Sequence, residues 1–214
     1  MHLTKEDIEN TERIRRLNII NSVTGIKPAN LIGSISEDGE SNLAIFSSVI
    51  HLGSNPALLG LIVRPDREAG QHTYDNILKT GFYTINHVQE SFIEPAHYTS
   101  AKFKRDESEF DKCHFTEEYL PDFMAPFVKE STLKLGMKFR QIIPIELNKT
   151  VLVIGEIEQL IVPDEAVDNE GHIDLSRVKD VGISGLNSYY KLEKIAQFPY
   201  ARPQSLPDFG GKTV

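Results

Sequence analysis

The stretch NLAIFSS at residues 42–48 decides how this chain folds. It is an apolar run that finishes in two serines. An Asp-Gly pair at residues 38–39 separates it from a second apolar run, NLIGSIS, at residues 30–36. Asp-Gly between two such runs is a strong signal for a tight β-hairpin. We therefore expect a pair of antiparallel strands, the second of which covers residues 43–50.

The same β-rich rhythm continues along the chain. Runs of apolar or β-branched residues predict further strands over 58–63, 82–87, 138–147 and 150–161. The run VLVIGEI at 151–157 is nearly all apolar, which is typical of a strand covered on both faces. About six strands, mostly joined by tight turns, indicate an antiparallel barrel decorated by helices. Periodicity alone leaves a split barrel, an OB-like barrel and a sandwich open.

Helical signals are confined to short segments. A capping signal at Thr4 predicts a leading helix over 4–23. The polar segment 73–80 predicts a short helix that Thr73 caps. Residues 88–130 hold three prolines and no clean strand, so we expect short helices and loops there.

The domain organisation follows from these elements. We expect an N-terminal helical segment at 1–28 and one barrel domain at 29–200. The domain carries a helical insertion near 88–130. The Pro- and Gly-rich residues 201–214 are expected to form an irregular tail.

The composition bounds the class of protein. The chain has 214 residues and a net charge of −8. Sequence-independent binding of nucleic acid requires a basic surface, so the negative net charge argues against a nucleic-acid partner. No run approaches the ~20 apolar residues of a membrane span. The single cysteine, Cys113, excludes an intrachain disulfide. We expect a cytoplasmic protein with neither a membrane nor a nucleic-acid partner.

Sequence motifs for other chemistry are missing. The histidines and the cysteine show no His-x-x-x-His or Cys-x-x-Cys spacing, so we expect no metal site. Neither a Gly-x-Ser-x-Gly elbow nor a Gly-x-Gly-x-x-Gly dinucleotide loop occurs.

Taken in order, the strings from 30 to 86 resemble the flavin reductase-like, FMN-binding split-barrel family. Its typical pattern is an apolar strand, a G-x-x-N-x-A-x-F-S hairpin, a Pro-led strand, a T-x-x-N-I helix start and a G-x-F-x-x-N strand. Similar strings stand here at 39–47, 55–63, 73–77 and 81–86. The resemblance implies a mainly β fold with helical decorations, an antiparallel FMN-binding split β-barrel.

The resemblance also implies where the flavin ring lies. In the family, the strand with the N-x-A-x-F-S pattern runs beside the ring. An extended backbone offers alternating N–H and C=O groups that match the pyrimidine edge, and a small residue allows close approach. The expected ring site is Asn42, Leu43, Ala44, Ile45, Phe46 and Ser47. Alone, this string is also typical of an ordinary half-buried strand.

The phosphate of FMN needs hydroxyl donors and a positive charge. Arg64 ends a strand and supplies the charge, and the helix start near 73 adds free N–H groups. The expected phosphate ligands are Ser47, Ser48, Arg64, Thr73 and Asn76. A salt bridge of Arg64 with Asp66 or Glu68 is the alternative interpretation. His72 departs from the family, which has a charged pair before the threonine.

The resemblance implies a homodimeric oxidoreductase with FMN as cofactor and NADH or NADPH as reductant. Hydride transfer to a flavin requires no protein acid or base, so we name no catalytic residue. Two alternatives stay open. One is an FMN electron carrier without nicotinamide activity, and the other is a barrel that has lost flavin and serves as a binding module.

Overall fold

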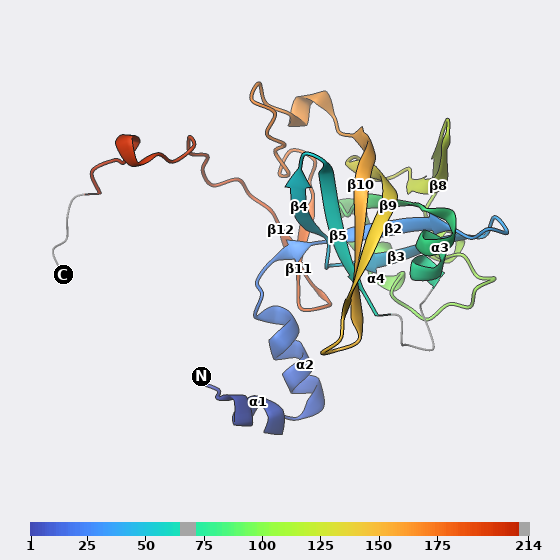
Figure 1. Ribbon diagram of the computed structural model, residues 1–214, viewed down its shortest axis with the longest axis horizontal. Helices are drawn as coiled ribbons and strands as arrows, with labels where there is room; N and C mark the ends of the chain where they lie inside the picture. The colour runs from blue at the N-terminus through green and yellow to red at the C-terminus, as the bar shows by residue number, and fades with distance from the viewer. Residues whose placement is uncertain (65–71, 210–214) are drawn as a thin grey trace.

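The computed structural model describes residues 1–64 and 72–209. Within them, seven antiparallel strands form the main sheet, in the order β3-β2-β6-β9-β10-β5-β4 (Figure 1). Their bounds are Asn30–Ile35 (β2), Ser41–Phe46 (β3), Ile50–Ser54 (β4), Ala57–Val63 (β5), Phe82–His87 (β6), Lys134–Ile145 (β9) and Thr150–Ile161 (β10). Strands β3 and β4 are the two edges, so each has one side without a neighbouring strand in this sheet.

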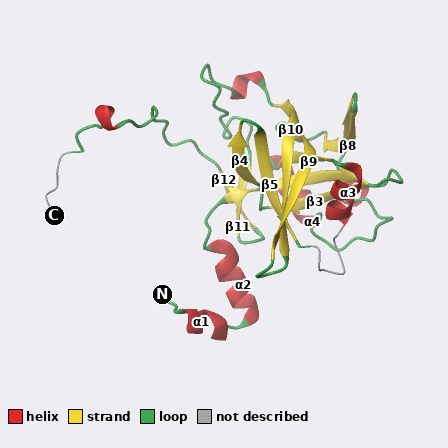
Figure 2. Cartoon of the chain, in the orientation of Figure 1, coloured by secondary structure: helices red, strands yellow, loops and turns green. Residues whose placement is uncertain are grey.

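Two smaller sheets and short helices complete the described part of the chain. The small sheets consist of β1 (Lys27–Pro28), β11 (Val181–Ser184) and β12 (Ser188–Lys191), and of β7 (Glu117–Leu120) and β8 (Phe123–Val128). The α-helices are α1 (Lys5–Asn10), α2 (Arg13–Ser22), α3 (His72–Thr80), α4 (Ile93–Tyr98) and α5 (Glu109–Lys112). Single 3-10 turns cover Glu90–Phe92, Asp164–Ala166 and Pro203–Ser205. Figure 2 shows strands making up the body and helices at its margin.

Alternation along the strands buries apolar side chains on both faces of the main sheet. Leu31 and Leu43 pack on one face with Phe110, whereas Ile32 packs on the other with Leu61. All five side chains are 0% exposed. Because burial on both faces fixes β2 and β3, the edge of the sheet at β3 is a rigid surface.

The predicted hairpin over residues 30–50 was confirmed, with one correction. Strands β2 and β3 pair in antiparallel register, and Gly39 between them has φ of 89°. The apolar run at 43–50 is not one strand, however, because β3 ends at Phe46 and β4 begins at Ile50. Ser47 and Ser48 therefore lie in the connection between β3 and β4 and not in a strand. Their hydroxyls can contribute to a binding site there.

The leading helix is broken into α1 and α2. Thr4 caps α1, as predicted, and forms a reciprocal capping box with Asp7. A second cap interrupts the run, since the Glu12 carboxylate accepts hydrogen bonds from the N–H groups of Ile14 and Arg15. This side chain satisfies the free N–H groups of a new helix start.

The expectation of a strand-free segment at 88–130 was wrong, because β7 and β8 lie within it. The three prolines obscured the pattern, and Pro126 lies inside β8. The Pro126 carbonyl accepts a hydrogen bond from Thr84 Oγ1 at 2.6 Å. A Cβ on Gly33 would stand 2.3 Å from the same carbonyl oxygen, so only glycine allows β8 to approach β2 this closely.

No helix among the described residues is long and apolar enough to cross a membrane.

Candidate functional site

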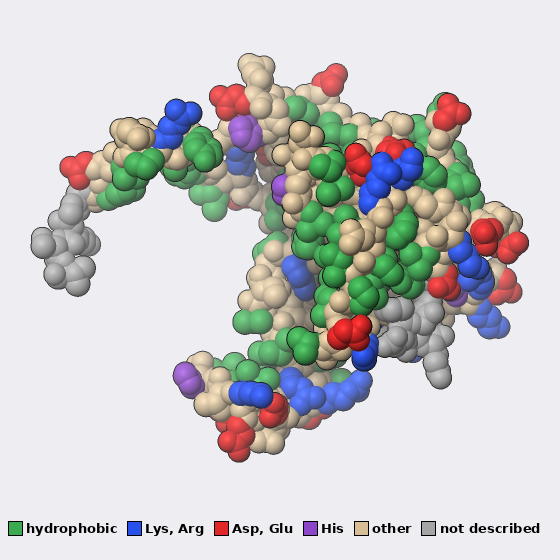
Figure 3. Space-filling model, viewed as in Figure 1, with side chains coloured by type: hydrophobic (Ala, Val, Ile, Leu, Met, Phe, Trp, Pro, Cys, Tyr) green, Lys and Arg blue, Asp and Glu red, His purple; other side chains and the backbone are tan. Residues whose placement is uncertain are grey.

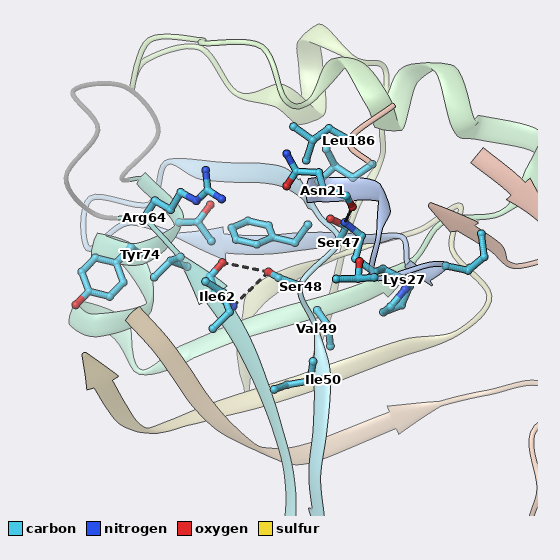
Figure 4. Close-up of a pocket in the computed structure, with 17 residues that line it drawn as sticks. Asn21, Lys27, Ser47, Ser48, Val49, Ile50, Ile62, Arg64, Tyr74 and Leu186 are labelled. Carbon is cyan, nitrogen blue, oxygen red and sulfur yellow. Dashed lines mark hydrogen bonds between the residues drawn. The ribbon is translucent and has the colours of Figure 1, made fainter. Parts of the chain in front are cut away.

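A cavity of about 700 Å³ lies where β3 and β5 end (Figure 4). Its size is in the range of small-molecule and cofactor pockets. Four separate segments build it. They are the β3–β4 connection with the end of β3 (45–50), the end of β5 (62–64), the first turn of α3 (73–74) and the stretch between α2 and β1 (21–28, in part), joined by Leu186.

Figure 4 shows how the labelled side chains lie. Arg64 extends its side chain from the end of β5 over the cavity, and Tyr74 points its ring away from it. Ser48 Oγ donates to the Ile62 carbonyl at 3.1 Å and accepts from the Ile62 N–H at 3.2 Å. Ser48 therefore joins the β3–β4 connection to β5, and this pairing fixes one wall of the cavity.

A second hollow of about 350 Å³ adjoins the other side of β3. It shares Ile45, Phe46 and Thr73 with the main cavity. Its remaining lining comes from β3, from the segment 99–103, from His72 and from Glu109. The end of β3 thus borders two spaces that share these lining residues.

The main-chain groups of this edge are available in an alternating pattern. The N–H of Leu43 points away from β2, because it donates to Glu109 Oε2 at 3.0 Å. In an antiparallel strand, every second residue directs its N–H and C=O to the same side. The N–H and C=O of Ile45 must therefore also face outward, into the lining of the two spaces.

A buried polar network fixes the start of α3 against this strand. Asn42 Nδ2 donates to Thr73 Oγ1 at 2.9 Å, and Asn76 Nδ2 donates to Ser34 Oγ at 3.2 Å. All four residues are buried. Helix α3 begins at His72, so Thr73 lies in its first turn and is not the cap that the sequence predicts. Its hydroxyl is instead an acceptor within the network.

The structure gathers most of the residues that the sequence predicts as flavin ligands. The main cavity is lined by Ile45, Phe46, Ser47, Ser48, Arg64 and Thr73, and the second hollow also by Asn42 and Ala44. Leu43 lies apart, with its side chain in the apolar core. Asn76 lines neither space and accepts a hydrogen bond from Arg105 Nη2 at 3.3 Å. For all the residues that the sequence predicts as flavin ligands, contact with a flavin stays a prediction.

Other lining residues escape sequence reasoning. Asn21 and Lys27 come from a distant segment and carry no motif. Leu186 lies in the string at 181–190, which loosely resembles a G-x-x-G-x-x-Y ending of the family and is expected near the barrel mouth. Lys27 Nζ donates to the carbonyls of Asn21 at 3.1 Å and Gly185 at 3.0 Å, which ties these segments together. Glu109 belongs to the string SEFDK at 108–112, which resembles the family's segment around an S-E-F-x-K string. The resemblance implies one rim of the active site, with a lid or dimer element as the alternative.

The charges around the two spaces are few. Burial lowers the pKa of His72, and the nearby Arg105 lowers it further. Burial raises the pKa of Glu109. Arg64 is exposed, and its alternative partners Asp66 and Glu68 lie outside the described residues. No group of three or more His, Cys, Asp or Glu in the described part of the chain is suited to a metal ion.

The donor set fits FMN. An apolar cavity suits the ring, a free N–H and C=O pair on β3 suits its pyrimidine edge, and a cation beside hydroxyls suits the phosphate.

Comparisons with known proteins give an independent result. Residues 26–177 match the flavin reductase like domain. A candidate flavin reductase with a split barrel domain from Shewanella frigidimarina NCIMB 400 is 51% identical, with a TM-score of 0.90 over 94% of this chain and 100% of that one. Nitrilotriacetate monooxygenase component B from Bacillus cereus shares the fold at 20% identity and a TM-score of 0.80, over 92% and 98%. An FMN-binding protein from Thermus thermophilus shares it at 14% and 0.67, over 81% and 90%. The predicted split-barrel fold is confirmed.

The buried network predicts a structural role for Asn42. Asn42→Ala removes the donor to Thr73 and leaves a buried hydroxyl without its partner, which costs about 1–3 kcal/mol. We expect urea unfolding of the flavin-free protein to show this loss. Asn187→Ala, at an exposed turn residue, is the control and should leave the free energy of unfolding unchanged. Equal stability of Asn42→Ala and the wild type would contradict the role of this network.

Proposed function

Because the chain belongs to the flavin reductase-like family, we propose that it binds FMN in the main cavity and reduces it with NADH or NADPH. Family membership makes the protein a flavin-linked oxidoreductase. The choice of FMN, the nicotinamide donor and the placement of the flavin are the proposal.

One observation carries the placement. The outward N–H and C=O of Ile45 stand at the edge of β3, where no neighbouring strand takes them up. The pyrimidine edge of a flavin carries an N–H between two carbonyls, which is the complementary pattern. Ala44 beside this position is small, so the ring can approach the main chain closely.

The phosphate end of FMN is assigned to the region of Arg64 and Thr73. Arg64 is a cation at the mouth of the cavity, and α3 begins nearby with N–H groups that have no helical partner. Ser47 adds a hydroxyl from the β3–β4 connection. Ser48 is less available as a donor, because its hydroxyl already bonds to Ile62.

Bound FMN would supply the hydride and electron chemistry. The protein orients the ring through β3 and covers it with apolar side chains such as Val49, Ile62 and Leu186, which limit the access of water. Lys27 holds the wall that carries Leu186. Neither proton donor nor base is assigned, since hydride transfer needs none.

Spectroscopy tests this function directly. We expect micromolar or tighter binding of FMN, weaker binding of riboflavin, and bleaching of the bound flavin when NADH or NADPH is mixed in without oxygen. Equal affinity for FMN and riboflavin would contradict the assignment of a phosphate-binding site. Binding without bleaching by either nicotinamide would favour the FMN electron carrier.

Arg64→Ala should weaken FMN binding while leaving the fold intact, because Arg64 is exposed at a strand end. A charge-assisted hydrogen bond contributes about 1.5–3 kcal/mol. The Kd for FMN should therefore rise about tenfold to hundredfold, and the Kd for riboflavin should not change. Arg177→Ala is the control, since Arg177 pairs with Asp174 in another loop. An unchanged Kd for FMN would contradict the phosphate-binding role of Arg64 and leave it an ordinary surface residue.

The two ends of the chain support a homodimer. Helices α1 and α2 contain no buried residue. Isolated helices shorter than ~12–15 residues are marginal in water, so these helices need a partner surface. The segment after β12 leaves the body (Figure 1), and its Ile195, Phe198 and Tyr200 are 95%, 84% and 86% exposed.

The body offers a matching surface. Ile50, Leu52 and Ile143 are 45%, 40% and 43% exposed on the main sheet. Figure 3 shows apolar side chains both along the C-terminal segment and on the body. Helix α2 carries three arginines and no acidic residue, whereas the whole chain has a net charge of −8. A second copy therefore complements the C-terminal segment through apolar contacts and α2 through its opposite net charge.

Light scattering should give twice the chain mass of 24.1 kDa. Phe198→Asp should shift the protein toward the monomer, because it places a charge in the proposed interface. Met124→Asp is the matched control, since Met124 is 50% exposed on β8, which lies away from both ends in Figure 1. A wild-type monomer at micromolar concentration would contradict the dimer.

A further inference from the structure

Glu109 is a buried acid that the proposed reaction leaves without a role. It is 6% exposed, which is rare for a carboxylate, and it borders the second hollow beside β3. Its Oε2 accepts the hydrogen bond from the Leu43 N–H at 3.0 Å. A buried ionisable group costs free energy unless it has a partner, so this contact calls for an explanation.

Helix α5 is anchored, so the carboxyl of Glu109 has a fixed place. The next residue, Phe110, is 0% exposed and packs in the same apolar cluster as Leu43. Cys113 is 6% exposed and its N–H donates to the Glu109 carbonyl at 2.9 Å. Glu107 and Lys112 form an ion pair of 3.1 Å on the outer side of this turn.

The carboxyl changes what the edge of β3 offers to a ligand. Without it, the outward N–H groups of Leu43 and Ile45 would both be open, and a ring could bind in either of two registers two residues apart. With Leu43 occupied, the N–H of Ile45 is the one that faces the shared lining of the two spaces.

We propose that Glu109 is a positioning residue, which sets the register of the flavin on β3 by occupying the Leu43 N–H. This inference rests on the proposed function, since it assumes a flavin at this edge. It adds a residue that holds the binding strand and need not touch the ring.

The charge of Glu109 gives the proposal a second consequence. Burial raises the pKa of its carboxyl. Of the other charged or titratable groups, His72 and Lys102 line the second hollow with Glu109. Glu40, Arg105 and Glu107 border a separate small gap that Glu109 also lines. Burial and the nearby Glu109 raise the pKa of the Cys113 thiol. Above its pKa, Glu109 places a negative charge beside the flavin and disfavours the electron-rich reduced ring. Below its pKa, the neutral carboxyl still accepts from Leu43 through its C=O.

The experiment compares three variants with the wild type. Glu109→Ala removes the acceptor, Glu109→Gln keeps an amide oxygen but no charge, and Glu107→Gln is the matched control on the same turn. The readouts are the Kd for FMN by fluorescence quenching, the reduction potential of bound FMN against pH, and hydrogen exchange at the Leu43 amide without flavin.

Glu109→Ala should raise the Kd roughly tenfold, as for one hydrogen bond, and speed exchange at Leu43. Glu109→Gln should bind nearly as the wild type does. Its potential should exceed that of the wild type at high pH, and the two should converge as pH falls through the pKa of Glu109. Glu107→Gln should change none of these quantities.

Three results would overturn the proposal. They are unchanged FMN binding by Glu109→Ala, equal losses in Glu109→Ala and Glu109→Gln, or potentials of Glu109→Gln and the wild type that run parallel at every pH. If Glu109→Ala does not fold, the Glu109→Gln potentials still decide. A wild-type protein that binds no FMN would overturn the proposed function as well, and slow exchange at Leu43 would then mark the contact as purely structural.

Discussion

A strand at the edge of a sheet leaves every second N–H and C=O without a partner, and proteins must protect or use such groups. In this chain β3 is one of the two edge strands of the main sheet, and its outward-facing residues Leu43 and Ile45 have different surroundings. The Glu109 carboxyl accepts the hydrogen bond of the Leu43 N–H at 3.0 Å, whereas Ile45 lines two adjacent spaces. The site depends on this difference, because a flat ligand with alternating donors and acceptors can complete the edge where the protein does not.

The surrounding structure keeps that edge rigid and open. Leu31 and Leu43 are fully buried below it, and the Asn42–Thr73 bond fastens α3 beside it at 2.9 Å. The same bond places the start of α3 at the cavity, and the Ser48–Ile62 hydrogen bonds join the end of β5 to the β3–β4 connection. A phosphate near Arg64 would lie between these two fixed segments.

The local parts of this arrangement were predictable from sequence, and the long-range parts were not. Asp38-Gly39 predicts the β2–β3 hairpin because turn chemistry is local, and the ordered strings predict the split barrel through their resemblance to a family. The break after Phe46 was missed, since an apolar run does not show where a strand leaves its sheet. Thr73 was misread as a cap because its partner, Asn42, lies far away in sequence. Lys27 reaches the site only through tertiary packing, which no spacing rule encodes. Leu186 and Glu109 lie in strings that resemble family segments, but those strings do not indicate which contacts the two residues make.

The central claim is that the outer edge of β3 receives the flavin at Ile45. A crystal structure of the protein with FMN tests it most directly. We expect the pyrimidine edge to lie about 2.7–3.2 Å from the Ile45 main-chain N–H or C=O, with the phosphate near Arg64 and the Glu109–Leu43 contact intact. A flavin bound elsewhere, or one whose edge meets only side chains, would contradict the claim.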